Sequence, residues 1–122
     1  MDDEEPILSF VGRILEHLGY EAEFARDGSE ALESYRKARD GGNPFAAVVL
    51  DLTVPGGMGG QEAMEQLRAM DPDVKAIVSS GYSNDPVMAQ YKQYGFSGVI
   101  AKPYDIHTFS QVLHKAMAQD KV

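Results

Sequence analysis

Hydrophobic residues in this chain fall into two patterns, short continuous apolar runs and longer stretches with helical spacing. The continuous runs predict buried strands at residues 45–50, 74–79 and 97–101. A weaker run predicts a further strand at residues 21–25. The uniformly apolar run at residues 45–50 suits a strand that is covered on both faces of its sheet.

Helical spacing predicts five helices between and around these strands. The first follows Pro6 and ends before Gly19, and the second begins at Asp27, which can cap the helix together with Glu30. The glycines and proline of residues 41–44 end this second helix. The remaining helices are predicted at residues 61–70, 85–94 and 105–118.

Strands and helices therefore alternate along the whole chain. Such alternation is typical of α/β proteins with a doubly wound parallel sheet, flanked by helices on both faces. The length of 122 residues suits one domain, and no repeat or linker divides it. We therefore expect a single domain over residues 1–122.

Composition excludes several classes of protein. Nineteen acidic and eleven basic side chains give a net charge of −8, which disfavours direct binding to nucleic acid or to an anionic membrane. The absence of cysteine excludes disulfides and thiolate metal sites. The chain opens with acidic residues rather than with a signal peptide, so we expect a cytoplasmic location.

Charged residues stand at the ends of the predicted apolar elements. Asp51 ends the strand at residues 45–50, Asp2 and Asp3 precede the first helix, and Lys102 follows the last strand. Open α/β sheets build their sites at the carboxyl ends of strands, and clustered carboxylates need a cation beside them. This pattern predicts a site for a divalent metal and a phosphoryl group.

Four motifs together resemble the response-regulator receiver domain of two-component signalling, most closely the receivers of hybrid sensor histidine kinases. They are residues 2–6 (Asp-Asp-Glu-Glu-Pro), residues 51–60 (from Asp51 through the glycine-rich loop), residues 79–82 (Ser-Ser-Gly-Tyr) and residues 102–104 (Lys-Pro-Tyr). The resemblance covers essentially the whole chain and implies a flavodoxin-like fold.

The resemblance also implies a role for each site residue. Asp51 matches the phosphoryl acceptor, while Ser80 and Lys102 match the hydroxyl and the ammonium that contact the phosphoryl oxygens. The implied cofactor is Mg²⁺, held by Asp2, Asp3, Asp51 and the backbone carbonyl oxygen of Thr53.

The implied function is that of a phosphoacceptor, which takes a phosphoryl group from a histidine kinase or a histidine phosphotransfer domain and relays it by a conformational change. It is not an enzyme with external substrates. One alternative is a Mg²⁺-dependent phosphohydrolase with an aspartyl-phosphate intermediate, although such enzymes usually carry an acid where this chain has Thr53. Another is an interaction module that works without phosphorylation.

Two departures from the family pattern change the expectations. Val99 stands where an aromatic switch residue is common, and only Met1 precedes Asp2 where receivers have an apolar first strand. We therefore expect the first strand to be missing, between residues 21–25 and 45–50. Either further residues precede Met1, or the sheet closes by rearrangement or by strand exchange with a second chain. A dimer could otherwise form through the last strand–helix face.

Overall fold

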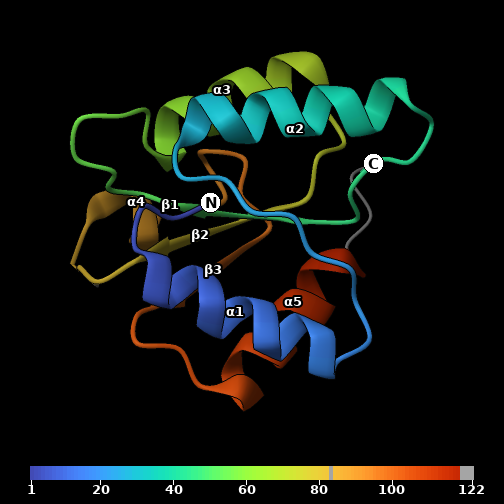
Figure 1. Cartoon of the computed structure of the whole chain (residues 1–122). Coiled ribbons are helices and arrows are strands. Elements are labelled where there is room, and N and C mark those ends of the chain that lie inside the picture. Colours follow the sequence, from blue (N-terminus) through green and yellow to red (C-terminus); the bar gives the residue numbers. More distant parts are fainter. Residues whose placement is uncertain (83, 119–122) are drawn as a thin grey trace.

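The computed structural model, which describes residues 1–82 and 84–118, has a parallel sheet between two layers of helices (Figure 1). The strands are β1 (Val48–Asp51), β2 (Ala76–Ser80) and β3 (Gly98–Ala101), side by side in the order β1-β2-β3. One layer contains α2 (Gly28–Asp40) and α3 (Gly60–Met70), and the other contains α1 (Glu5–His17) and α5 (Ile106–Met117). The short helix α4 (Pro86–Ala89) contacts β2.

The sheet separates the hydrophobic core into two clusters, because successive side chains of a strand point to opposite faces. Leu50 and Val78 pack against α2 and α3, whereas Ile77 and Ile100 pack against α1 and α5. All residues of β2 are buried, as expected for a strand covered on both faces. The predicted α/β class with a parallel sheet is confirmed.

The predicted helices other than the fourth are confirmed to within one or two residues. Asp27 caps α2 as predicted, since its carboxylate accepts a hydrogen bond of 3.0 Å from the Glu30 amide. The strands begin later than predicted, by three residues for β1. Pairing with β2 starts only where the Val48 amide donates to the Lys75 carbonyl, so among the described residues the segment 45–47 has no strand neighbour on that side.

The predicted helix at residues 85–94 is wrong in length, because α4 ends at Ala89. Beyond it the amides of Gln93 and Gly95 donate to carbonyls three residues earlier rather than four. The chain therefore turns tightly here, and its tyrosines pack against the core instead of continuing a helical stripe. Within the described part of the chain, no helix has the length and hydrophobicity needed to cross a membrane.

The predicted strand at residues 21–25 is not formed. A strand needs a neighbouring strand to bond with, and the only backbone hydrogen bond found here within the described residues runs from the Asp2 amide to the Ala25 carbonyl, at 3.0 Å. Between this segment and β1 lies a cavity of about 170 Å³. The gap expected from the missing first strand is present, and the sheet does not close across it by rearrangement.

Candidate functional site

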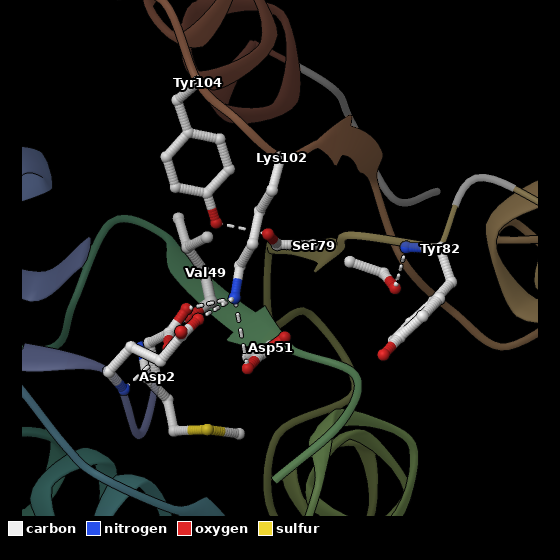
Figure 2. Close-up of polar contacts among 10 residues, drawn as sticks. Asp2, Val49, Asp51, Ser79, Tyr82, Lys102 and Tyr104 are labelled. Atoms are coloured by element: carbon white, nitrogen blue, oxygen red, sulfur yellow. Dashed lines mark hydrogen bonds and ion pairs between the residues drawn. The ribbon is translucent and has the colours of Figure 1, made fainter. Parts of the chain in front are cut away.

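The predicted charges meet at the carboxyl end of the sheet (Figure 2). The Lys102 ammonium lies 2.7 Å from an oxygen of Asp2 and 3.4 Å from an oxygen of Asp51. Both aspartates are only 3% exposed. Buried carboxylates repel one another unless a cation lies between them, and Lys102 supplies that charge here.

Backbone pairing with the first two residues holds Asp2 in this place. The Met1 amino group donates to the Val49 carbonyl at 2.6 Å, and the Asp51 amide donates to the Met1 carbonyl at 3.0 Å. This is the hydrogen-bond pattern of one residue in a parallel ladder, with Met1 beside Leu50. Met1 and Asp2 therefore form a short extended stub next to β1, from which the Asp2 side chain reaches Lys102.

Three carboxylates form a group that suits a divalent cation. Oxygen atoms of Asp2, Asp3 and Asp51 lie within 4.8 Å of one another, with Asp3 exposed and the other two buried. Hard oxygen donors at this spacing, with one side open to water, are the ligands that Mg²⁺ prefers, so the residues fit that ion. The Thr53 amide faces the Asp51 carboxylate, and the role of the Thr53 carbonyl oxygen as a ligand stays a prediction.

Of the two hydroxyls at the end of β2, Ser80 is the one that the sequence singled out. Its oxygen accepts a hydrogen bond of 3.0 Å from the Tyr82 amide, and no bond to Asp51 is found among the described residues. Sequence reasoning missed Ser79, which is fully buried, pairs in register with Asp51 and is hydrogen-bonded to the Tyr104 hydroxyl (Figure 2). The register of two adjacent strand ends could have indicated Ser79, but no pattern indicated its partner.

The glycine-rich loop after Asp51 packs tightly against the strand end. A side-chain carbon on Gly59 would lie 2.5 Å from the Leu52 carbonyl oxygen, and one on Gly60 would lie 2.8 Å from the Asp51 carbonyl oxygen. These two glycines therefore permit close packing beside the site.

Burial, and secondarily the nearby Asp2 charge, raise the pKa of Asp51 to about 6 despite the opposing effect of Lys102. Burial alone would lower the pKa of Lys102, but its hydrogen bond to Asp2 and the charges of Asp51 and Asp2 raise it above its usual value. Lys102 is thus a permanent cation, while Asp51 carries an unfavourable charge at neutral pH. The site favours a second cation or the removal of charge from Asp51.

This electrostatic cost predicts a pH-dependent gain in stability for Asp51→Asn. A carboxyl whose pKa is higher in the folded chain binds protons more readily there, so the free energy of unfolding falls as pH rises from about 4 to about 6. Asp51→Asn should therefore raise the free energy of unfolding at pH 8 by roughly 1–3 kcal/mol without Mg²⁺, and by little at pH 4. Urea unfolding at both pH values measures it.

A suitable control is Asp73→Asn, since Asp73 is exposed and precedes the amino end of β2, whereas Asp51 pairs with Ser79 near the carboxyl end. It should change the free energy of unfolding equally at both pH values. A loss of stability at pH 8 for Asp51→Asn would mean that the Asp51–Lys102 ion pair outweighs the cost of burial.

Comparisons with known proteins agree with this geometry. A family model described as the response regulator receiver domain matches residues 1–114. Sporulation initiation phosphotransferase F of Bacillus subtilis is 26% identical over 94% of this chain and 88% of its own length. The autoinducer sensor kinase/phosphatase CqsS of Vibrio cholerae is 32% identical over 86% of this chain, which spans only 15% of that protein.

Solved structures share the fold. The receiver domain of the sensor histidine kinase PA1611 from Pseudomonas aeruginosa, described with a magnesium ion coordinated in its active-site cleft, has a TM-score of 0.83 and 21% identity. The comparison covers 98% of this chain and 94% of the other. The receiver domain family, whose model matches residues 1–114, consists of phosphoacceptor modules rather than enzymes with external substrates. With its acidic cluster at the carboxyl end of a parallel sheet, this chain belongs to the response regulator receiver domain family.

Proposed function

We propose that Asp51 accepts a phosphoryl group from a phosphohistidine of a partner protein. A carboxylate oxygen of Asp51 attacks the phosphorus atom, the phosphorus–nitrogen bond breaks, and the histidine nitrogen leaves with its electron pair and takes up a proton. The product is an acyl phosphate on Asp51. The observation that carries the proposal is the position of Asp51. It is buried at the end of β1, close to the carboxylates of Asp2 and Asp3 and to the Lys102 ammonium.

The residues around Asp51 suit the charge of the incoming group. Lys102 can exchange its ion pair with Asp51 for one with the phosphoryl oxygens, and the Ser80 hydroxyl, whose oxygen accepts from the Tyr82 amide, can donate its proton to them. Mg²⁺, when bound, would neutralise charge on the transferring oxygens. We propose that its ligands are Asp2, Asp3, Asp51 and the carbonyl oxygen of Thr53.

In this proposal the partner is a histidine kinase or a histidine phosphotransfer domain. The whole chain, residues 1–122, acts as one receiver domain, and it acts in the cytoplasm. The similarity to CqsS and to the receiver of PA1611 supports a receiver of the hybrid-kinase type. Similarity to the sporulation phosphotransferase equally supports a stand-alone regulator. In both cases the phosphorylated domain relays the signal through a change at its surface.

Transfer from a phosphohistidine donor tests this function. With Mg²⁺ and a phosphotransfer domain labelled on its histidine, the chain should gain one acid-stable, base-labile phosphoryl group per molecule within minutes. A phosphohydrolase would instead release inorganic phosphate from excess donor over many turnovers. Thr53, which cannot act as the general acid that such enzymes use, favours the receiver. If the chain neither gains the label nor releases phosphate, the remaining function is that of an interaction module that works without phosphorylation.

Lys102→Ala should separate metal binding from phosphoryl transfer. Removing the ammonium leaves Asp2 and Asp51 buried without their cation, so the metal-free variant should lose about 3–5 kcal/mol of stability. Its affinity for Mg²⁺ should be unchanged or higher, because a neighbouring positive charge is gone. Its phosphorylation should nevertheless be slower by roughly 10²-fold or more. Calorimetric titration with Mg²⁺ and labelling rates measure both effects.

Lys92→Ala is the matched control, because Lys92 is exposed and forms no ion pair among the described residues. It should leave Mg²⁺ affinity and labelling unchanged. A large fall in Mg²⁺ affinity for Lys102→Ala, but not for Lys92→Ala, would show that Lys102 organises the carboxylates and does not act on the phosphoryl group.

A further inference from the structure

The carboxyl end of β2 carries a buried polar pair on a largely apolar face of the sheet. Ser79 is fully buried, and its hydroxyl is hydrogen-bonded to the hydroxyl of Tyr104, beyond the end of β3 (Figure 2). Side chains two residues apart on a strand share a face, so Ser79 lies on the face of Ile77, which belongs to the apolar cluster with Ile100 and Phe109. A buried hydroxyl costs free energy unless it is paired, and two apolar side chains could fill the same place equally well. Stability alone therefore does not explain the pair.

The pair lies beside the charged group of the site. Ser79 is directly opposite Asp51 in the register of β2 and β1. Tyr104 is two residues beyond Lys102 in the chain. Burial raises the pKa of Tyr104, and the charges of Lys102 and Asp51 also act on it at this range. The two hydroxyls thus join β2 to the turn after β3 at the point where Lys102 approaches Asp51.

Two contacts fasten the segment that carries Lys102 to β2. At the start of this segment the Lys102 amide donates to the Ser80 carbonyl at 2.9 Å. At its end the Tyr104 hydroxyl is hydrogen-bonded to Ser79. Every residue of β2 is buried, so both contacts are made to a well-packed strand. Together they fix the backbone on both sides of the Lys102 side chain.

The lysine side chain needs such support because its stem is flexible and its ion pairs change during the reaction. In the metal-free structure the Lys102 ammonium is held by Asp2 and Asp51. To act on the phosphoryl oxygens it must leave these partners, and its position then depends on the backbone that carries it. Catalysis is sensitive to a misplacement of about 1 Å, so the backbone contacts matter most at this moment.

We propose that Tyr104, held by Ser79, is a positioning residue that keeps the Lys102 ammonium directed at the phosphoryl group on Asp51. This inference rests on the proposed transfer to Asp51. Tyr104 acts through Lys102 and does not contact the phosphoryl group itself. Its hydroxyl should therefore affect the reaction only while Lys102 is present.

A cycle of single and double variants tests this dependence. With Mg²⁺ and acetyl phosphate, Tyr104→Phe should slow the labelling of Asp51 roughly fivefold or more. In the Lys102→Ala background the same substitution should change the rate by less than about twofold, because the group through which it acts is gone. Equal slowing in both backgrounds, or no slowing in the wild-type background, would overturn the inference. A wild-type chain that gains no label would instead overturn the proposed function, and this inference with it.

The double variant Ser79→Ala/Tyr104→Phe separates positioning from packing. It removes both hydroxyls, so neither is left buried without a partner, and its melting temperature should lie closer to that of the wild type than the melting temperature of Tyr104→Phe does. Its labelling should nevertheless stay as slow as that of Tyr104→Phe. Labelling that recovers together with the melting temperature would mean that the pair only packs the end of the strand, and would overturn the inference.

Tyr35→Phe is the matched control. Tyr35 is also a buried tyrosine, and its hydroxyl donates to Asp71 at 2.7 Å, before the amino end of β2 and so at the opposite end of the sheet from the charged group. This variant should have a lower melting temperature and an unchanged labelling rate. Slowing equal to that of Tyr104→Phe would show that lost stability alone reduces labelling, which would also overturn the inference.

Discussion

Asp51→Asn is expected to abolish phosphoryl labelling of the chain. With Mg²⁺ and acetyl phosphate, the wild-type protein should gain one phosphoryl group, and the variant should stay at background, a loss of roughly 10²-fold or more. A carboxamide is a poor nucleophile toward phosphorus, and it cannot replace the charge of a metal-binding carboxylate. Radiolabel incorporation or intact mass measures the result. The same substitution should stabilise the metal-free fold, so lost labelling cannot be ascribed to unfolding.

Asp73→Asn should label like the wild type, since Asp73 is exposed and precedes the amino end of β2, opposite the end that holds the cluster. Label that persists on Asp51→Asn would place the acceptor elsewhere. The two other buried or clustered carboxylates, Asp2 and Asp3, would then be the residues to test next.

Filling the cavity beside β1 covalently should have the largest effect on stability. Five apolar residues added before Met1 would extend the Met1–Asp2 stub into a strand along Val49 and Ala47. Cavities cost about 24 cal/mol per Å³, so filling about 170 Å³ should add on the order of 4 kcal/mol to the free energy of unfolding. For a domain of this size, the melting temperature should rise by roughly 10–20 °C.

Two controls accompany that extension. Five residues of glycine and serine at the same position should leave the melting temperature nearly unchanged. With the apolar extension, light scattering should show a monomer. An unchanged melting temperature with the apolar extension would mean that residues 21–25 and β1 gain nothing from a strand between them.

The clustering of the charged residues could be predicted from the sequence better than the sheet could. Asp51 and Lys102 lie far apart in the chain, yet each follows an apolar strand, and parallel strands bring their carboxyl ends to one edge. Asp2, which precedes the first helix, joins them there. A rule of topology was therefore enough to bring these charges together. The pKa of Asp51 could not be predicted in the same way, because it depends on how deeply the cluster is buried.

The errors in the predicted fold arise where the secondary structure of a segment depends on the elements that lie beside it. Residues 21–25 have a strand-like composition, but without a paired strand they stay irregular. The helix beginning at Pro86 ends at Ala89, and beyond it Tyr91 and Tyr94 pack against the core. The hydrogen bond between Ser79 and Tyr104 depends on strand register, which local pattern does not specify.

The most direct measurement is to map the modified residue. The wild-type chain, phosphorylated with Mg²⁺ and a phosphodonor, is reduced with borohydride, which converts an aspartyl phosphate to homoserine, and is then digested and sequenced by mass spectrometry. We expect homoserine at position 51 and at no other aspartate. Homoserine at another position, or a phosphoryl group that survives on a histidine or serine, would contradict the assignment of Asp51 as the phosphoryl acceptor.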